Sequence, residues 1–272
     1  MDQQNEQLFV GVDEYDAPAN ALLFSPDQKQ RDRFEKLAHL FKTQFFSPMK
    51  DAGSTIQKYW LTGVLPAFRD GISPLAATDI ISSRPEYNGL CGFTDDEVSV
   101  IARTYLSPSP AADIELALDE IKRWDGGYNF SPDGGAKSLL TLYNPQQVFG
   151  HLRALKEKTE IRHGEHLHSS TILRAISVGP IPFRDFFLEA LLGHLEATIM
   201  TAFGPVDMKR IAIDRDITWT LLYYFGVFTC GEARRLRIPN QAMTGLVRLA
   251  STISFSPEFN TLHRLQTVSE QS

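Results

Sequence analysis

Three carboxylates follow a short apolar run close to Met1. The run spans residues 8–12, and the acids after it are Asp13, Glu14 and Asp16. It has the length and the Val and Phe content of a buried strand. In open α/β sheets, ligands bind at the carboxyl ends of the strands, where an aspartate can hold Mg²⁺ and a neighbouring glutamate can polarise water. The spacing is that of a Walker B element, although acidic strand ends without any function also occur.

A second apolar run, residues 58–66, supplies the next polar side chain, Thr62. Between the two runs, Ser25 and Pro26 are typical of a helix start, and apolar residues then recur at helical spacing for roughly twenty residues. The recurring residues are Phe34, Leu37, Ala38, Phe41 and Phe45, which we expect to face a core. A strand, a helix and a second strand predict a parallel pair. Thr62 would then lie on the same sheet edge as Asp13, where it could contact a γ-phosphate or water, or simply cap its strand.

The rest of the chain is predicted to be mainly helical. A capping box of Thr94 and Glu97 and an Asn144–Pro145 pair predict two helix starts. The expected helices cover residues 95–106, 111–124, 146–155, 169–177, 182–202 and 214–226, with one more after a short strand near 236–240. The expected turns and loops cover residues 17–20, 68–90 and 126–135.

Composition excludes several classes of protein. The 272 residues carry a net charge of −6, which argues against a general nucleic-acid-binding surface. Two distant cysteines, Cys91 and Cys230, define neither a disulfide framework nor a zinc site. The start of the chain lacks the pattern of a signal peptide, and the longest apolar stretch, residues 219–228, is too short to span a bilayer. We therefore expect an intracellular protein, cytoplasmic or nuclear, without a membrane partner.

Three other groups of residues have simpler explanations than chemistry. His163, His166 and His168 could gather a metal ion, but exposure in a polar loop is the favoured interpretation. Residues 134–138 (GGAKS) lack the glycine that a phosphate loop has before its lysine, so a surface turn is favoured. Residues 119–122 contain the E-x-K spacing of a nuclease half-site, but their periodicity is helical.

Several separated motifs occur together in one order. They are residues 10–18 (VGVDEYDAP), 61–64 (LTGV), 92–98 (GFTDDEV), 124–130 (WDGGYNF), 143–145 (YNP), 224–229 (YFGVFT) and 237–240 (RIPN). With these motifs the chain resembles the AAA-ATPase-like family of fungal and bacterial proteins, from the Walker B strand onward. In that family the ATPase-like domain often precedes a nuclease domain of the PD-(D/E)XK type.

The resemblance implies an α/β fold, with a partial P-loop NTPase-like parallel sheet followed by a mainly helical region. Residues 1–106 would be the ATPase-like portion, 107–255 the helical region and 256–272 a polar tail. Mg-ATP would be the cofactor, with Asp13 on the magnesium side in the second shell and Asp16 also binding the cofactor. Glu14 would activate water, and Thr62 would be sensor-like.

One departure from the family pattern changes what we expect of the chain. A phosphate-binding loop, G-x-x-x-x-G-K-[ST], should precede the Walker B strand, but only seven residues precede Leu8. The chain therefore resembles the middle of a longer family member, as a truncated form would. We expect that it does not hydrolyse ATP by itself. The alternative is a non-catalytic partner-binding protein or a degenerate fragment. In either case an exposed sheet edge predicts that the chain is poorly soluble or associates with itself.

Overall fold

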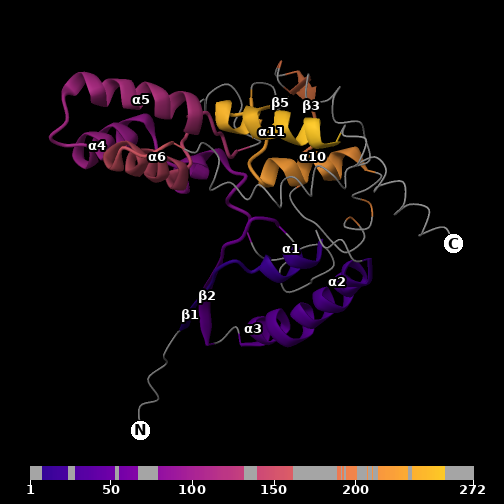
Figure 1. Ribbon diagram of the computed structural model, residues 1–272. Coiled ribbons are helices and arrows are strands. Elements are labelled where there is room, and N and C mark those ends of the chain that lie inside the picture. The colour runs from indigo at the N-terminus through magenta and orange to yellow at the C-terminus, as the bar shows by residue number, and fades with distance from the viewer. Residues whose placement is uncertain are drawn as a thin grey trace, which may run out of the picture. The chain divides into compact units, whose positions relative to one another are not determined.

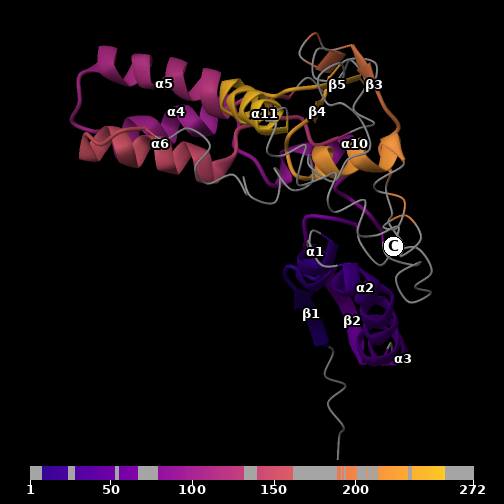
Figure 2. The same cartoon turned by 45° about the vertical axis from the view of Figure 1, so that its right-hand side comes forward.

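The computed structural model describes residues 8–23, 28–52, 55–66, 79–131, 140–161, 189–190, 192, 194–200, 207, 210, 214–231 and 235–254. Contacts divide the chain into two units. The first unit comprises residues 1–80 and 199–224, and the second comprises residues 81–198 and 225–272. Figures 1 and 2 show their elements from two sides.

The first unit is built on the parallel strand pair that the sequence predicts. Strand β1 (Leu8–Val12) pairs with β2 (Ile56–Leu61) in parallel, and Val12 lies opposite Leu61. The two strands run side by side in both views (Figures 1 and 2). The predicted pairing is confirmed, although β2 begins two residues earlier than its apolar run. Both chain segments therefore leave the sheet at the same edge.

Helices connect the two strands, with two differences from the sequence-based expectation. The turn expected at residues 17–20 is instead the start of α1 (Ala17–Leu23), because proline is well tolerated in a first helical turn. Helix α2 (Gln28–Leu40) continues through a π-helical segment, η1 (Phe41–Phe46), into α3 (Ser47–Asp51). The expected burial of Phe45 is wrong, since Phe46 is buried instead. The wider π turn shifts the apolar face by one residue.

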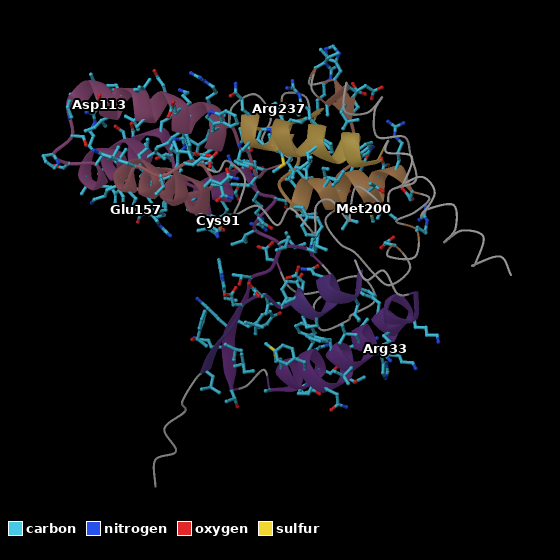
Figure 3. All side chains as sticks on the ribbon, viewed as in Figure 1. Arg33, Cys91, Asp113, Glu157, Met200 and Arg237 are labelled. Atoms are coloured by element: carbon cyan, nitrogen blue, oxygen red, sulfur yellow. The ribbon has the colours of Figure 1, made fainter. Side chains whose placement is uncertain are left out.

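Helix α10 (Arg215–Tyr224) completes the described part of the first unit. It is buried along almost its whole length, as expected for the apolar stretch around Trp219. Its Thr220 hydroxyl accepts a hydrogen bond from the Met200 amide, and the Tyr224 hydroxyl donates to the Met200 carbonyl. Met200 is labelled in Figure 3. Among the described residues, no helix is both long enough and apolar enough to cross a membrane.

Three helices of the second unit pack against one another (Figures 1 and 2). They are α4 (Asp95–Tyr105), α5 (Ala111–Asp125) and α6 (Pro145–Glu157), and all three were predicted. Their shared core consists of Val98, Ala102, Ile121, Tyr143, Val148 and Leu152. Helix α4 belongs to this unit, although the sequence placed it with the ATPase-like portion. The proposed domain limits themselves remain predictions.

The predicted caps begin two of these helices. The Thr94 hydroxyl accepts a hydrogen bond from the Glu97 amide, and the Glu97 carboxylate accepts one from the Thr94 amide at 2.8 Å. The bond from the Thr94 backbone is the main reason why the pKa of Glu97 is lowered. The capping bond therefore stabilises the folded protein at pH values above the ordinary glutamate pKa. This stabilisation is lost as the pH falls through the lowered pKa that Glu97 has in the folded protein. Asn144 caps α6 through the amides of Gln146 and Gln147.

Short strands and a last helix complete the second unit. Strands β3 (Leu195–Glu196), β5 (Arg235–Arg237) and β4 (Thr229–Cys230) form an antiparallel sheet in that order, and α11 (Gln241–Ser254) follows. The helix expected through residue 202 is therefore wrong at β3. Leu195 is fully buried opposite Leu236, so sheet pairing outweighs local helical periodicity here. A 3₁₀ helix, η3 (Pro85–Leu90), lies within the expected loop.

Taken together, the chain has a mixed α/β fold with a small parallel sheet and many helices. Several expectations fall outside the described residues: the helix at 169–177, the three histidines of residues 163–168, the GGAKS segment and the polar tail. Cys91 is exposed (Figure 3) and Cys230 is buried, and neither forms a disulfide.

Candidate functional site

Asp13 and Thr62 meet where the two parallel strands end. Asp13 follows β1 directly and Thr62 follows β2 directly. The Thr62 hydroxyl donates a hydrogen bond to Asp13 Oδ1, and the Glu14 amide donates to the same oxygen at 3.0 Å. Both residues are exposed, and nothing among the described residues donates to Asp13 Oδ2. One carboxylate oxygen is thus held in place while the other stays open to a ligand.

Glu14 presents a carboxylate from a strained backbone. Its φ of 48° lies in the left-handed region, which costs a non-glycine residue about 1–3 kcal/mol. The residue is exposed, and within the described part of the chain its carboxylate makes no hydrogen bond or ion pair. Strained positions of this kind cluster at functional sites. The carboxylate is therefore available to a water or a ligand, as an activating acid would need to be.

Asp16 lies in a different environment from the other two acids. The residue is only 1% exposed. Its Oδ2 accepts hydrogen bonds from the Leu65 amide at 2.6 Å and from Asn20 Nδ2 at 2.8 Å. The Val64 amide lies 3.1 Å from both carboxylate oxygens. The structure thus surrounds the expected cofactor-binding carboxylate of Asp16 with donors from this chain itself.

The described residues do not form a closed metal site. No group of three or more histidine, cysteine or acidic side chains that could hold a metal ion occurs among them. Mg²⁺ at nucleotide sites is held by one or two carboxylates together with phosphate and water oxygens, so a single exposed aspartate fits that arrangement. Asp13 could contribute its open oxygen through a water. The phosphate ligands would have to come with the nucleotide.

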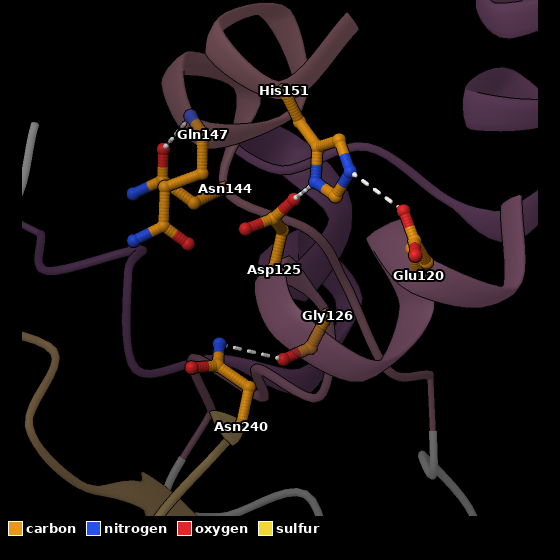
Figure 4. A network of polar contacts seen from close by, with 7 residues as sticks. All are labelled: Glu120, Asp125, Gly126, Asn144, Gln147, His151 and Asn240. Carbon is orange, nitrogen blue, oxygen red and sulfur yellow. Dashed lines mark hydrogen bonds and ion pairs between the residues drawn. The ribbon is translucent and has the colours of Figure 1, made fainter. Parts of the chain in front are cut away.

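The second unit contains a buried polar cluster that the sequence analysis did not identify (Figure 4). Asp125, the last residue of α5, lies with its Oδ2 2.9 Å from Nδ1 of His151 on α6. Nε2 of the same ring lies 3.6 Å from Glu120 Oε2. Asp125 and His151 are both almost completely buried. The sequence did carry a signal for a buried polar group. Gln147 and His151 lie on the buried side of α6, together with the apolar Val148 and Leu152.

Hydrogen bonds to backbone carbonyls join this cluster to residues 237–240. Asn240 donates to the Gly126 carbonyl at 2.9 Å (Figure 4), and Arg237 donates to the Gly127 carbonyl at 2.7 Å. Burial lowers the pKa of Arg237 and raises the pKa of Tyr128 to about 12. At neutral pH Tyr128 is therefore a protonated phenol. The hydrogen bonds of Asp125, Arg237 and Asn240 hold parts of this unit together, so this cluster serves the packing of the unit, and the strand-end residues are the better candidate site.

Comparison with known proteins supports a family for the region that contains this site. Residues 1–73 match the model of the predicted AAA-ATPase family. That range includes Asp13, Glu14, Asp16 and Thr62, and the match supports an AAA-ATPase-like protein. The fusion to a nuclease domain and the assignment of residues 8–16 as a Walker B element stay predictions.

A curated relative extends the similarity to most of the chain. It is a protein of Azotobacter chroococcum mcd 1, described as an uncharacterized protein in the vnfD 5′ region, and it is 27% identical over 267 residues. The aligned region covers 93% of this chain but 44% of the relative. The chain thus spans less than half the length of this relative. No solved structure matches the chain.

Proposed function

We propose that the ends of β1 and β2 form the magnesium- and water-handling half of a Mg-ATP site. The observation that carries the proposal is the hydrogen bond from the Thr62 hydroxyl to Asp13 Oδ1, at the carboxyl ends of two parallel strands. Nucleotides bind at such edges in α/β sheets. The similarity of residues 1–73 to predicted AAA-ATPases supports the same assignment.

Each of the three side chains has a role that suits its environment. Asp13, with one oxygen fixed, orients a water of the magnesium shell. Glu14, exposed on its strained backbone, takes a proton from the attacking water. Thr62 contacts the γ-phosphate or that water through its hydroxyl oxygen, whose proton is committed to Asp13. Magnesium supplies charge neutralisation of the phosphate oxygens when it is bound.

The 272-residue chain does not contain a phosphate-binding loop, which we call the phosphate cradle. No G-x-x-x-x-G-K-[ST] motif occurs in the 272 residues. That motif provides the amides and the lysine that hold the β- and γ-phosphates. We propose that hydrolysis requires this cradle from another segment, and that the 272-residue chain by itself does not turn over ATP.

Replacing Glu14 with glutamine tests the proposed water-activating role. The test compares the 272-residue chain with the longest product that its gene encodes, in Mg-ATP thermal shift and steady-state ATPase assays. We expect no Mg-dependent shift from the chain alone, and both binding and hydrolysis from a product that carries the cradle. In that product Glu14→Gln should lower turnover about 100-fold or more and leave ATP binding intact, because only the base is lost.

The matched control is Asp51→Asn, which makes the same acid-to-amide change at an exposed position on α3 of the same unit. Its turnover should stay within twofold of the unmodified protein, by the usual behaviour of distant surface changes. A Glu14→Gln protein with unchanged turnover would overturn the assigned role. A longest product that binds no Mg-ATP would overturn the proposed function itself.

A second candidate function, self-association, is favoured by the apolar side chains on the strand pair. Phe9 of β1 is 67% exposed and Trp60 of β2 is 45% exposed. Within the described part of the chain the parallel sheet has two strands and therefore two outer edges. A two-stranded sheet is marginal in water, and an uncovered edge is a template for another strand. We propose that a second copy of this chain pairs there.

Replacing Phe9 with lysine is expected to weaken this association by about tenfold in dissociation constant, since edge lysines oppose strand pairing. Light scattering after size-exclusion chromatography, over a range of protein concentrations, measures the effect. The matched control is Val100→Lys, an equally exposed apolar position on α4. A chain that is monomeric at all concentrations, or equal effects of both substitutions, would contradict pairing at the sheet.

A further inference from the structure

The buried carboxylate of Asp16 fixes the segment that carries Thr62. Three donors converge on it, namely the amides of Val64 and Leu65 and the side chain of Asn20. Two of these donors lie only two and three residues beyond Thr62. Two of its three donors belong to residues 64–65, so the carboxylate holds the chain that leaves β2.

Neighbouring backbone bonds reinforce this connection. The Thr62 amide donates to the Val12 carbonyl at 2.9 Å, and the Tyr15 amide donates to the Thr62 carbonyl at 3.0 Å. The Tyr15 hydroxyl donates to the Leu65 carbonyl at 2.8 Å. Residues 12–16 and 62–65 are thus joined on both sides of the point where Thr62 meets Asp13.

Gly63 allows the close approach that these bonds require. A Cβ atom at this position would lie 2.3 Å from Asp16 Oδ1 and 2.9 Å from Tyr15 Cδ1. Real Cβ contacts do not reach such distances, so any side chain here would push residues 62–65 away from Asp16. The residue directly after Thr62 therefore has to be glycine for the carboxylate to reach its donors.

We infer that Asp16 is a positioning residue of the proposed Mg-ATP site and not a ligand of its cofactor. It holds residues 62–65 against residues 12–16 and thereby sets the Thr62 hydroxyl at bonding distance from Asp13. The inference rests on the proposed function for its catalytic consequence. Its geometric part, the coupling of Asp16 to Thr62, concerns the chain alone.

The first experiment is spectroscopic and uses the 272-residue chain without nucleotide. Asp16→Asn removes the charge and leaves one acceptor oxygen in place of two, so the amides of Val64 and Leu65 lose their charged acceptor. We expect the Thr62 methyl ¹³C resonance to shift and the Val64 and Leu65 amides to exchange with solvent about tenfold faster or more, since bonds to a charged group are lost. Thr62→Ser, which lacks the methyl group, assigns the resonance.

Asn20→Ala is the matched control, because it removes one donor to the same carboxylate without touching residues 62–65. The Thr62 resonance should stay in place in this variant. Gly63→Ala provides a second route to the same effect and should move the resonance while Asp16 is intact. An unmoved Thr62 resonance in both Asp16→Asn and Gly63→Ala, or an equal movement in Asn20→Ala, would overturn the inference.

A kinetic experiment separates the inference from the proposed function. In a product that hydrolyses ATP, Asp16→Asn should lower kcat about tenfold or more with KM for Mg-ATP unchanged, as expected of misplaced transition-state contacts. A raised KM with unchanged kcat would instead make Asp16 a cofactor ligand and overturn the inference. If no product hydrolyses ATP, the proposed function fails, and the Thr62 resonance still decides whether Asp16 positions Thr62.

Discussion

Replacing Asp125 with alanine is expected to lower the free energy of unfolding by about 3 kcal/mol. The carboxylate lies 2.9 Å from Nδ1 of His151, and both side chains are almost fully buried. Removal of one member leaves the other without its bonding partner in a region that water does not reach, and such groups carry the full cost of desolvation. Urea denaturation followed by circular dichroism measures the change.

A second variant of Asp125 separates the contribution of its charge from that of its hydrogen bond, and a surface variant serves as the control. Asp125→Asn keeps an oxygen that can accept from Nδ1, so we expect a smaller loss of about 1 kcal/mol. A loss as large as that of the alanine variant would show that charge, and not the hydrogen bond, dominates. Asp119→Ala, at an exposed position on the same helix, should change stability by less than about 0.5 kcal/mol. An Asp125→Ala cost no greater than this control would contradict the prediction.

Replacing Gly127 with alanine should be similarly severe, with a loss of about 3 kcal/mol or more. The residue has a φ of 88°, which side chains rarely adopt. An added Cβ would also lie 2.2 Å from the Pro239 carbonyl oxygen, a backbone atom that cannot rotate away. The loop would have to separate from residues 237–240, breaking the bonds from Arg237 and Asn240 to it. Thermal and urea unfolding both report the loss.

The same substitution elsewhere in this unit has the opposite expected sign. Gly245 lies within α11, and an added Cβ there meets nothing within 4 Å. Gly245→Ala should therefore stabilise the protein by about 0.5–1 kcal/mol, as alanine does in helix interiors. Equal effects of the two glycine substitutions would show that residues 126–127 do not pack against Pro239 as the structure has them.

Local sequence signals were sufficient for much of the secondary structure. The capping pair of Thr94 and Glu97 and the Asn144–Pro145 start gave α4 and α6, because a cap is made by residues two or three positions apart. They were insufficient at Leu195, where the partner that makes a strand is Leu236, far along the chain. They also failed at Phe46, since a π turn changes the register of the residues after it.

In the candidate site too, local sequence patterns predict some features and contacts between distant residues decide the others. The order of an apolar run and three acids predicts that Asp13 and Glu14 lie at a strand end, and the helix and second strand predict that Thr62 joins them. The different environment of Asp16 was not predictable, because the Val64 and Leu65 amides that donate to it are 48 and 49 residues away. Asp125 and His151 were missed for a related reason, since neither stands in a recognisable motif with the other.

By itself, the sequence determined the strand–helix–strand start, most helix boundaries and the acids that a nucleotide site could use. These follow from periodicity, caps and turn residues, which act over a few positions. The tertiary structure alone decided which acid is exposed and which is buried, which glycine must stay glycine, and which polar groups pair inside the second unit. Burial and hydrogen-bond partners are set by residues far apart in the chain, and only folding brings them within reach.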